Sequence, residues 1–128
     1  MKFGSTVLFV ENVQSVMDFY QKAFGMEISM YDPSFDFGIL NMEGGSIGIA
    51  SNHSGELMMP GKFPTSKNGH PDGVEIAFYS NDVKADFQKA VEAGATPITV
   101  PRKMEWGQTV AYVKSIEGTI IGICSEMA

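Results

Sequence analysis

The chain lacks the cysteines that an internal disulfide would require. Cys124 is the only cysteine among 128 residues, and a single thiol has no partner within its own chain. Disulfides persist in oxidising compartments and are rare in the cytoplasm. The cysteine count therefore favours a protein of the reducing cytoplasm, in which Cys124 serves as a small buried hydrophobic residue.

Basic residues are also scarce. Nine Lys and Arg residues stand against 15 Asp and Glu residues, the formal net charge is −6, and the sequence contains no basic run. Nucleic-acid binding depends on clustered Lys and Arg that neutralise phosphates. The charge balance therefore argues against a nucleic-acid partner and favours neutral or cationic ligands.

Long hydrophobic runs are missing as well. The apolar stretch from Val7 to Val10 ends at Glu11, so it is too short for a membrane span or for the hydrophobic region of a signal peptide. We therefore expect no membrane association. Apolar residues nevertheless make up 44% of the chain, which suffices for one domain with a buried core or for two small fused modules.

The sequence does contain one order of elements that occurs twice. In the first half, alternation over residues 3–10 predicts a strand, and Asn12 is a suitable N-cap for an amphipathic helix that Gly25 ends. Three apolar runs separated by turn residues follow, and they predict strands over residues 26–31, 35–42 and 46–51. The predicted order of the first half is therefore βαβββ.

The second half repeats this order. Residues 74–79 predict a strand, and Asp82 is the expected N-cap of a helix that ends at Gly94. Three further strands are predicted over residues 96–100, 108–114 and 119–125. The chain is therefore predicted to be an α+β protein, built as a duplication of a βαβββ module.

A segment rich in Gly, Pro, Ser and Asn separates the two halves. It covers residues 52–72 and is predicted to be a long loop that joins the modules, about 1–51 and 73–128, within a single domain 1–128. Loops of this length are often functional lids. The sequence leaves open whether this loop is a lid or a linker.

One glycine in each half stands between two isoleucines of a predicted strand. Gly48 follows Ile47, and Gly122 follows Ile121. Glycine in a strand interior costs about 0.5–1 kcal/mol relative to alanine and is typical of a bulge or of a close approach to the backbone. The repetition of this triplet indicates a common reason for both glycines.

The duplicated βαβββ order, the segment FVENVQSVMDFYQKAFGMEI in the first half and WGQTVAYV near the end resemble the vicinal oxygen chelate superfamily. That superfamily includes glyoxalase I, extradiol dioxygenases, and fosfomycin-resistance and bleomycin-resistance proteins. The resemblance covers almost the whole chain. It implies that the two modules form a cup of curved mixed sheets with the helices outside. It also implies a homodimer, and it leaves open whether the modules are swapped between chains.

Strand alternation then predicts which side chains face this cup. Large aliphatic residues such as Ile49 and Ile123 are assigned to the helix side, and the alternate positions are assigned to a small-molecule site. The predicted ligand-binding residues are Ser5, Val7, Phe9, Ser46, Gly48, Ala50, Glu75, Ala77, Tyr79, Trp106, Tyr112, Gly122 and Cys124. Trp106 equally fits a simpler role as the anchor of the turn before its strand.

The resemblance also implies where metal-dependent relatives hold their divalent ion. The corresponding positions here are Ser5, Gly48, Glu75 and Gly122. Only Glu75 is a strong ligand, whereas a catalytic site of this kind needs about three. We therefore expect no metal and no other cofactor, and a cup floor of bare backbone at the two glycines.

The two histidines do not change this expectation. His53 and His70 both lie at the ends of the long segment between the modules. A ligand role would require that segment to fold back over the cup, so both are expected to be exposed loop residues.

Three classes of function remain open. The missing metal ligands favour a metal-independent protein that sequesters an aromatic or cationic drug or metabolite, similar to the bleomycin-resistance branch. The alternative is a lyase, isomerase or dioxygenase-type enzyme that uses Glu75 as general base or an atypical metal site. The third class is a structural or regulatory module that uses the fold only for association.

Overall fold

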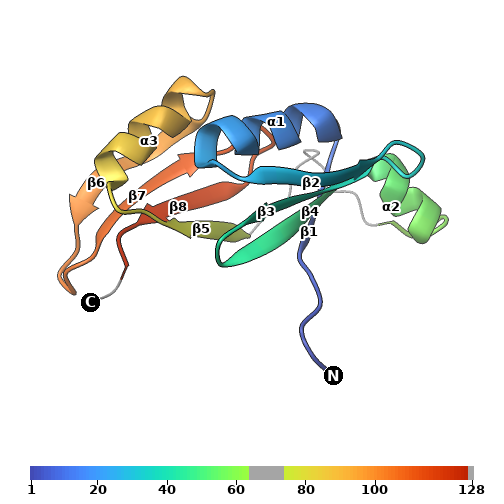
Figure 1. The fold of residues 1–128 in the computed structure, drawn as a ribbon, viewed down its shortest axis with the longest axis horizontal. Coiled ribbons are helices and arrows are strands. Elements are labelled where there is room, and N and C mark those ends of the chain that lie inside the picture. The colour runs from blue at the N-terminus through green and yellow to red at the C-terminus, as the bar shows by residue number, and fades with distance from the viewer. Residues whose placement is uncertain (64–73, 127–128) are drawn as a thin grey trace. The chain divides into compact units, whose positions relative to one another are not determined.

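The computed structural model describes residues 1–63 and 74–126 (Figure 1). The elements of this part of the chain, in order, are β1 (Val7–Val10), α1 (Val13–Phe24), β2 (Glu27–Asp32), β3 (Phe37–Met42), β4 (Gly45–Ser51), α2 (Asn52–Met58), β5 (Glu75–Tyr79), α3 (Val83–Glu92), β6 (Thr96–Lys103), β7 (Thr109–Lys114) and β8 (Ile120–Cys124). The described residues form two compact units, one of residues 1–21 and 25–63 and the other of residues 22–24 and 74–126.

The first unit contains a four-stranded mixed sheet with the strand order β1-β4-β3-β2. Strands β1 and β4 are parallel, with Val7 opposite Gly48, and the other two pairs are antiparallel. The helix α1 begins as predicted, because Oδ1 of Asn12 accepts a hydrogen bond from the N–H of Ser15 at 3.0 Å. It ends at Gly25, whose φ of 76° places it in the left-handed region.

The core of the first unit lies on one face of this sheet. Leu8, Leu40 and Ile49 are buried there, and Met17 and Tyr20 of α1 are buried as well. These strand residues alternate with the positions assigned to ligand binding. The predicted division of β4 into a helix side and a second face is therefore confirmed for Ile49.

The second unit repeats the topology with the order β5-β8-β7-β6. Strands β5 and β8 are parallel, with Ala77 opposite Gly122. Asp82 is the N-cap of α3, because its Oδ1 accepts a hydrogen bond from the N–H of Ala85 at 3.1 Å. The helix α3 lies along β6, β7 and β8, and its Phe87 and Ala90 are buried, as are Ile121 and Ile123 (Figure 1). The predicted α+β fold of two tandem βαβββ modules is confirmed.

Strands β1 and β6 differ most from the prediction, each at one end. Strand β1 begins at Val7 and not at residue 3, so Ser5 lies outside the strand and is exposed. Strand β6 continues past Pro101 to Lys103, although the predicted strand ended at residue 100. Because β6 is the edge strand of its sheet, it tolerates a residue without an N–H, and its pairing is irregular between Thr99 and Arg102.

The segment expected to be a loop begins with a short helix. Helix α2 (Asn52–Met58) follows β4 directly, because Oγ of Ser51 accepts a hydrogen bond from the N–H of Ser54 at 2.9 Å. The high content of Gly, Ser and Asn predicted a loop and concealed this N-cap. The later part of the predicted loop, with His70, lies outside the described residues. Among the described residues, none of the three helices has the length and hydrophobicity required of a transmembrane helix.

Gly38 allows close contact between α1 and the first sheet. A Cβ atom at Gly38 would approach Sδ and Cε of Met17 more closely than 3.0 Å and would lie 3.2 Å from the carbonyl oxygen of Met30. We expect Gly38→Ala to lower the free energy of unfolding by about 1–3 kcal/mol, because the added methyl group overpacks the core. Urea unfolding measures this change.

The matched control is Gly45→Ala in β4 of the same sheet. A Cβ atom at Gly45 would meet no heavy atom within 4 Å. Alanine there restricts the unfolded chain without a clash, so the free energy of unfolding should stay unchanged or rise by up to about 1 kcal/mol. Equal effects of the two substitutions would contradict the contact with Met17.

Candidate functional site

Strand register gathers the predicted site residues of the second unit on one face of its sheet. Direct neighbours across the strands share a face, and Ala77 is opposite Gly122, which is opposite Tyr112. Glu75, Tyr79 and Cys124 belong to the same face by alternation. We call this surface, made of Glu75, Ala77, Tyr79, Tyr112, Gly122 and Cys124, the Gly122 face.

The floor of the Gly122 face is not bare, in contrast to the prediction. A Cβ atom at Gly122 would lie 3.0 Å from Oε2 of Glu75 and 3.3 Å from Cε1 of Tyr112. The absence of a side chain lets the carboxylate and the phenol ring approach the strand backbone from both neighbouring strands. Gly122 is therefore the position at which a charged group and an aromatic ring meet.

The negative charge of Glu75 affects the two titratable groups beside it. The pKa of the Tyr112 hydroxyl is raised above 10.0, first by burial and then by the charges of Glu75 and Cys124, while Arg102 acts in the opposite direction. Burial also raises the pKa of the Cys124 thiol above 9.0, and Glu75 raises it further. The Tyr112 hydroxyl and the Cys124 thiol therefore both stay neutral at neutral pH.

The first unit carries an equivalent surface with different chemistry. Gly48 shares a face with Val7 and Ile39 by register, and Ala50 shares it with Phe9 and Phe37. Ser46 lies on the same face and is exposed. We call this surface, made of Val7, Phe9, Phe37, Ile39, Ser46, Gly48 and Ala50, the Gly48 face.

Side chains also cover the backbone at Gly48. A Cβ atom there would lie 3.0 Å from Cε2 of Phe37 and 3.1 Å from Cγ2 of Val7. The prediction of a bare floor is therefore wrong for both glycines, because neighbouring side chains fill the space that a missing Cβ leaves. In the first unit these neighbours are apolar, whereas in the second unit one of them is a carboxylate.

Two further predicted residues lie outside these faces. Ser5 precedes β1 and is exposed, so it is not held beside Gly48 by strand pairing. Trp106 lies in the loop between β6 and β7, is 59% exposed, and donates a hydrogen bond from Nε1 to Oε1 of Gln108 at 3.0 Å. Gln108 in turn donates from Nε2 to the carbonyl oxygen of Ser125 at 2.7 Å. This arrangement fits the turn-anchor role of Trp106.

Sequence reasoning missed two residues that belong near these surfaces. Arg102, whose charge acts on Tyr112, was left out because the predicted strand ended at residue 100, two residues before it. Phe63 was assigned to a loop, yet its ring packs on Phe9, with the two ring centroids 4.8 Å apart. The sequence signal that could have indicated an ordered position for Phe63 was Ser51. Ser51 is the N-cap of α2, and α2 ends a few residues before Phe63.

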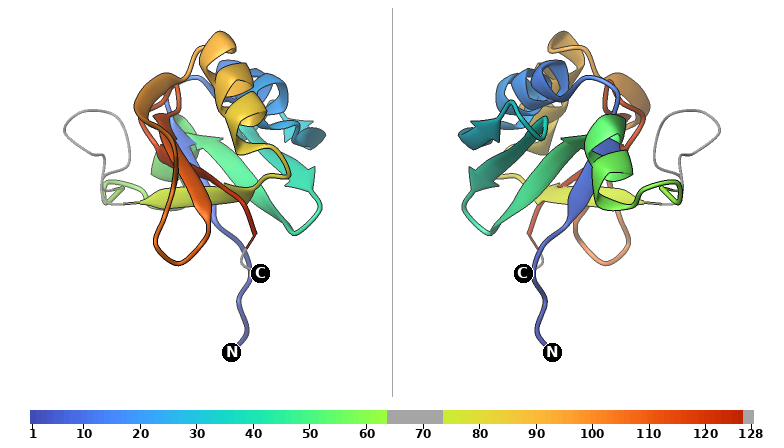
Figure 2. Two further views of the ribbon diagram at one scale, coloured as in Figure 1. Left: turned by 90° about the vertical axis from the view of Figure 1, so that its left-hand side faces the viewer. Right: turned by 90° about the vertical axis from the view of Figure 1, so that its right-hand side faces the viewer.

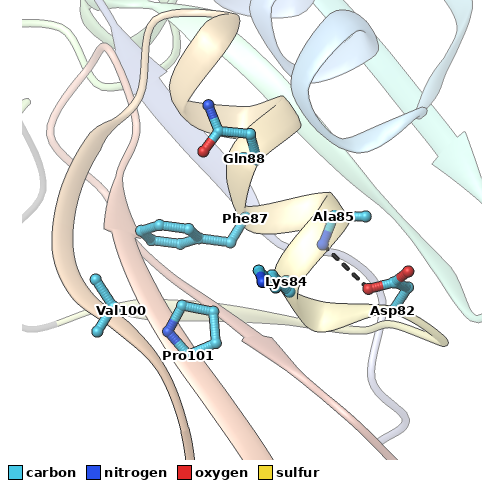
Figure 3. A pocket seen from close by; sticks show the side chains of 7 residues that line it. All are labelled: Asp82, Lys84, Ala85, Phe87, Gln88, Val100 and Pro101. Atoms are coloured by element: carbon cyan, nitrogen blue, oxygen red, sulfur yellow. Dashed lines mark hydrogen bonds between the residues drawn. The ribbon is translucent and has the colours of Figure 1, made fainter.

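A hollow of about 710 Å³ lies elsewhere in the second unit, between α3 and β6. It is lined by Asp82, Lys84, Ala85, Phe87, Gln88, Val100 and Pro101. Figure 3 shows the Phe87 ring directed from α3 toward Val100 and Pro101 on β6. None of the predicted site residues lines this hollow.

The possible metal ligands do not gather at either face. Within residues 1–63 and 74–126, no group of three or more His, Cys, Asp or Glu side chains is arranged to hold a metal ion. The Glu75 carboxylate lies close to the backbone at Gly122, as do side-chain atoms of Tyr112 and Ala77. His53 is exposed on α2. The donor set of the described residues therefore does not fit the metal site of metal-dependent relatives.

The fold consists of two βαβββ modules in tandem. In each module the first strand lies at the edge of the sheet and pairs in parallel with the last strand, which has a glycine at its centre. The sequence matches the family described as Glyoxalase/Bleomycin resistance protein/Dioxygenase superfamily over residues 2–121. The chain belongs to this superfamily.

Comparisons with individual proteins agree with this assignment. An uncharacterised protein of Mycobacterium bovis is 34% identical over 112 residues, which cover 83% of this chain and 71% of that protein. An uncharacterised protein of Mycobacterium tuberculosis is equally similar, and the match spans 64% of its length. Among solved structures, a glyoxalase/bleomycin resistance protein/dioxygenase family enzyme from Burkholderia phytofirmans PsJN has a TM-score of 0.82 at 22% identity, covering 94% of this chain and 95% of that one. This last likeness shows the fold alone.

The single thiol offers a direct test of the Gly122 face. We expect the pH profile of Cys124 alkylation by iodoacetamide to have its midpoint above pH 9.0, because burial and the Glu75 charge both disfavour the thiolate. In Glu75→Gln the midpoint should move down, yet stay above 9.0, since burial is the larger cause. Glu105→Gln, which removes an exposed carboxylate from the β6–β7 loop, should leave the midpoint where it is. A midpoint that does not respond to Glu75→Gln would contradict the electrostatic effect of Glu75 on the Cys124 thiol.

Proposed function

We propose that this protein is a metal-independent small-molecule binding protein that sequesters an aromatic cation on the Gly122 face. The observation that carries the proposal is the approach of the Glu75 carboxylate and the Tyr112 ring to the backbone at Gly122. A carboxylate supplies the charge complementary to a cation, and an adjacent aromatic ring supplies a stacking surface. Glu75 and Tyr112 together recognise both the positive charge and the aromatic ring of one ligand.

Exposure and charge support this choice of ligand. Glu75 is exposed, and Tyr79 on the same face is 67% exposed. A large exposed aromatic side chain on a sheet face is available to a ligand ring. The net charge of −6 favours the approach of cations over anions. Cys124 and Tyr112 remain neutral at neutral pH, so they do not compete with Glu75 for the charge of the ligand.

The location and assembly that we propose follow from the same reasoning. A single cysteine favours the reducing cytoplasm. Members of this superfamily often bind small molecules and form dimers, and we propose a homodimer for this chain. Light scattering at micromolar concentration measures the mass of the particle, and a mass of one chain would contradict the dimer.

The ligand proposal is tested with benzyltrimethylammonium as the probe and benzyl alcohol as its neutral counterpart. We expect the wild-type protein to bind the cation more tightly, as measured by calorimetric titration. Glu75→Gln should weaken cation binding by about 5-fold, because the charge pair is partly solvated. Binding of benzyl alcohol should not change in this variant.

The control is again Glu105→Gln, which removes the same charge from the molecule at a position outside the Gly122 face. If both variants weaken cation binding equally, the effect is one of net charge and the proposed site is wrong.

Metal independence is tested separately by elemental analysis of the purified protein. We expect no stoichiometric Ni, Zn, Mn or Fe, because the relevant positions carry Ser5, Gly48 and Gly122 beside Glu75. One tightly held ion per chain, removed by a chelator together with ligand binding, would contradict this proposal.

A further inference from the structure

The chain that follows β4 brings the aromatic ring of Phe63 into contact with the ring of Phe9 on β1. The ring of Phe63 meets that of Phe9 edge to face, with centroids 4.8 Å apart and an angle of 61° between the ring planes. Phe9 belongs to the Gly48 face. Phe63 is therefore an aromatic ring that the chain itself brings to this face.

The Phe63 ring also lies close to Gly55 of α2. A Cβ atom at Gly55 would approach Cδ1, Cε1 and Cζ of Phe63 more closely than 3.0 Å. Glycine inside a helix costs about 1 kcal/mol relative to alanine. Gly55 is buried within α2, and its lack of a side chain makes room for the Phe63 ring.

Three hydrogen bonds determine the path of the chain from α2 to Phe63. The N–H of Met59 donates to the carbonyl oxygen of Gly55 at 2.9 Å, and the N–H of Lys62 donates to the carbonyl oxygen of Met59 at 2.9 Å. The N–H of Gly61 donates to Oε1 of Glu56 at 2.6 Å. The φ of Gly61 is 71°, which reverses the chain. Figure 2 shows α2 beside β1, on which Phe9 lies.

The Phe63 ring nevertheless remains partly open to solvent. Phe9 and Phe63 are both half-buried, in contrast to the fully buried Tyr20 and Leu40 of the core. An aromatic pair of this kind contributes only about 0.5–1.5 kcal/mol beyond the area it buries. The ring beside Gly55 is therefore not one of the fully buried residues of the core.

We infer that Gly55 and Phe9 form a seat for a single neutral aromatic ring, which Phe63 occupies in the free protein and which an aromatic ligand takes over. This goes beyond the proposed function, because the seat lies in the first unit and does not involve Glu75. The affinity of a ligand for the seat is reduced by the fraction of molecules in which Phe63 fills it. Phe63 is thus an internal competitor.

Toluene, which has the structure of the phenylalanine side chain, is the probe for this seat. We expect Phe63→Ala to bind toluene about 3- to 10-fold more tightly than the wild-type protein in an NMR titration, because the competitor is gone. In the wild-type protein, saturating toluene should abolish the nuclear Overhauser contact between the Phe63 and Phe9 rings.

Two further variants make the result specific. Adding Gly55→Ala to Phe63→Ala should remove the gain in affinity, since a methyl group then projects into the seat. Phe35→Ala removes an exposed aromatic ring from the β2–β3 turn and should bind toluene as the wild-type protein does. Phe63→Leu is measured alongside, with a gain smaller than that of Phe63→Ala, so that a folding defect in one variant does not remove the comparison.

The inference is overturned if Phe63→Ala and Phe63→Leu bind toluene no more tightly than the wild-type protein. It is also overturned if the contact between Phe63 and Phe9 persists at saturating toluene. Binding of benzyltrimethylammonium, with its dependence on Glu75, is measured on the same variants and should be unaffected. Failure of the seat and failure of the proposed function are therefore seen in different measurements.

Discussion

Burial of one face of each sheet is the constraint from which the rest of the structure follows. Ile49 in the first unit and Ile121 in the second are fully buried. Because side chains alternate along a strand, a shift of one residue would expose these isoleucines and bury their neighbours. Gly48 and Gly122 are thereby held on the other face of each sheet, at equivalent positions of the repeated module.

The two glycines act in the same way and produce different surfaces. Each lacks the side chain that would keep its neighbours away from the strand backbone. At Gly48 the space is filled by Phe37 and Val7, which are apolar, whereas at Gly122 it is filled by the Glu75 carboxylate and the Tyr112 ring. A duplicated fold has thus acquired one apolar face and one face with a charged group, and the raised pKa values of Tyr112 and Cys124 belong to the charged one.

Local signals predicted the elements well where they were complete. Asn12 with Gly25, and Asp82 before α3, have the side-chain and backbone properties of helix ends, and both helices begin where expected. Composition was less reliable than these caps. The segment after β4 has the composition of a loop, yet Ser51 begins a helix there. Pro101 has the local properties of a strand end, yet β6 is an edge strand whose pairing with β7 is irregular between Thr99 and Arg102, so it tolerates a residue without an N–H.

The sequence by itself determined the repeated βαβββ order, the alternation that assigns Glu75 and Gly122 to the face opposite the large aliphatic residues of their strands, and the absence of strong ligands at Gly48 and Gly122. These properties depend on near neighbours in the chain and on a strand period of two. Only the tertiary structure decided what covers each glycine, because Glu75 and Gly122, or Phe9 and Phe63, meet through strand pairing and chain reversal over long separations. Contacts of that kind depend on the packing of whole elements, which no short sequence pattern records.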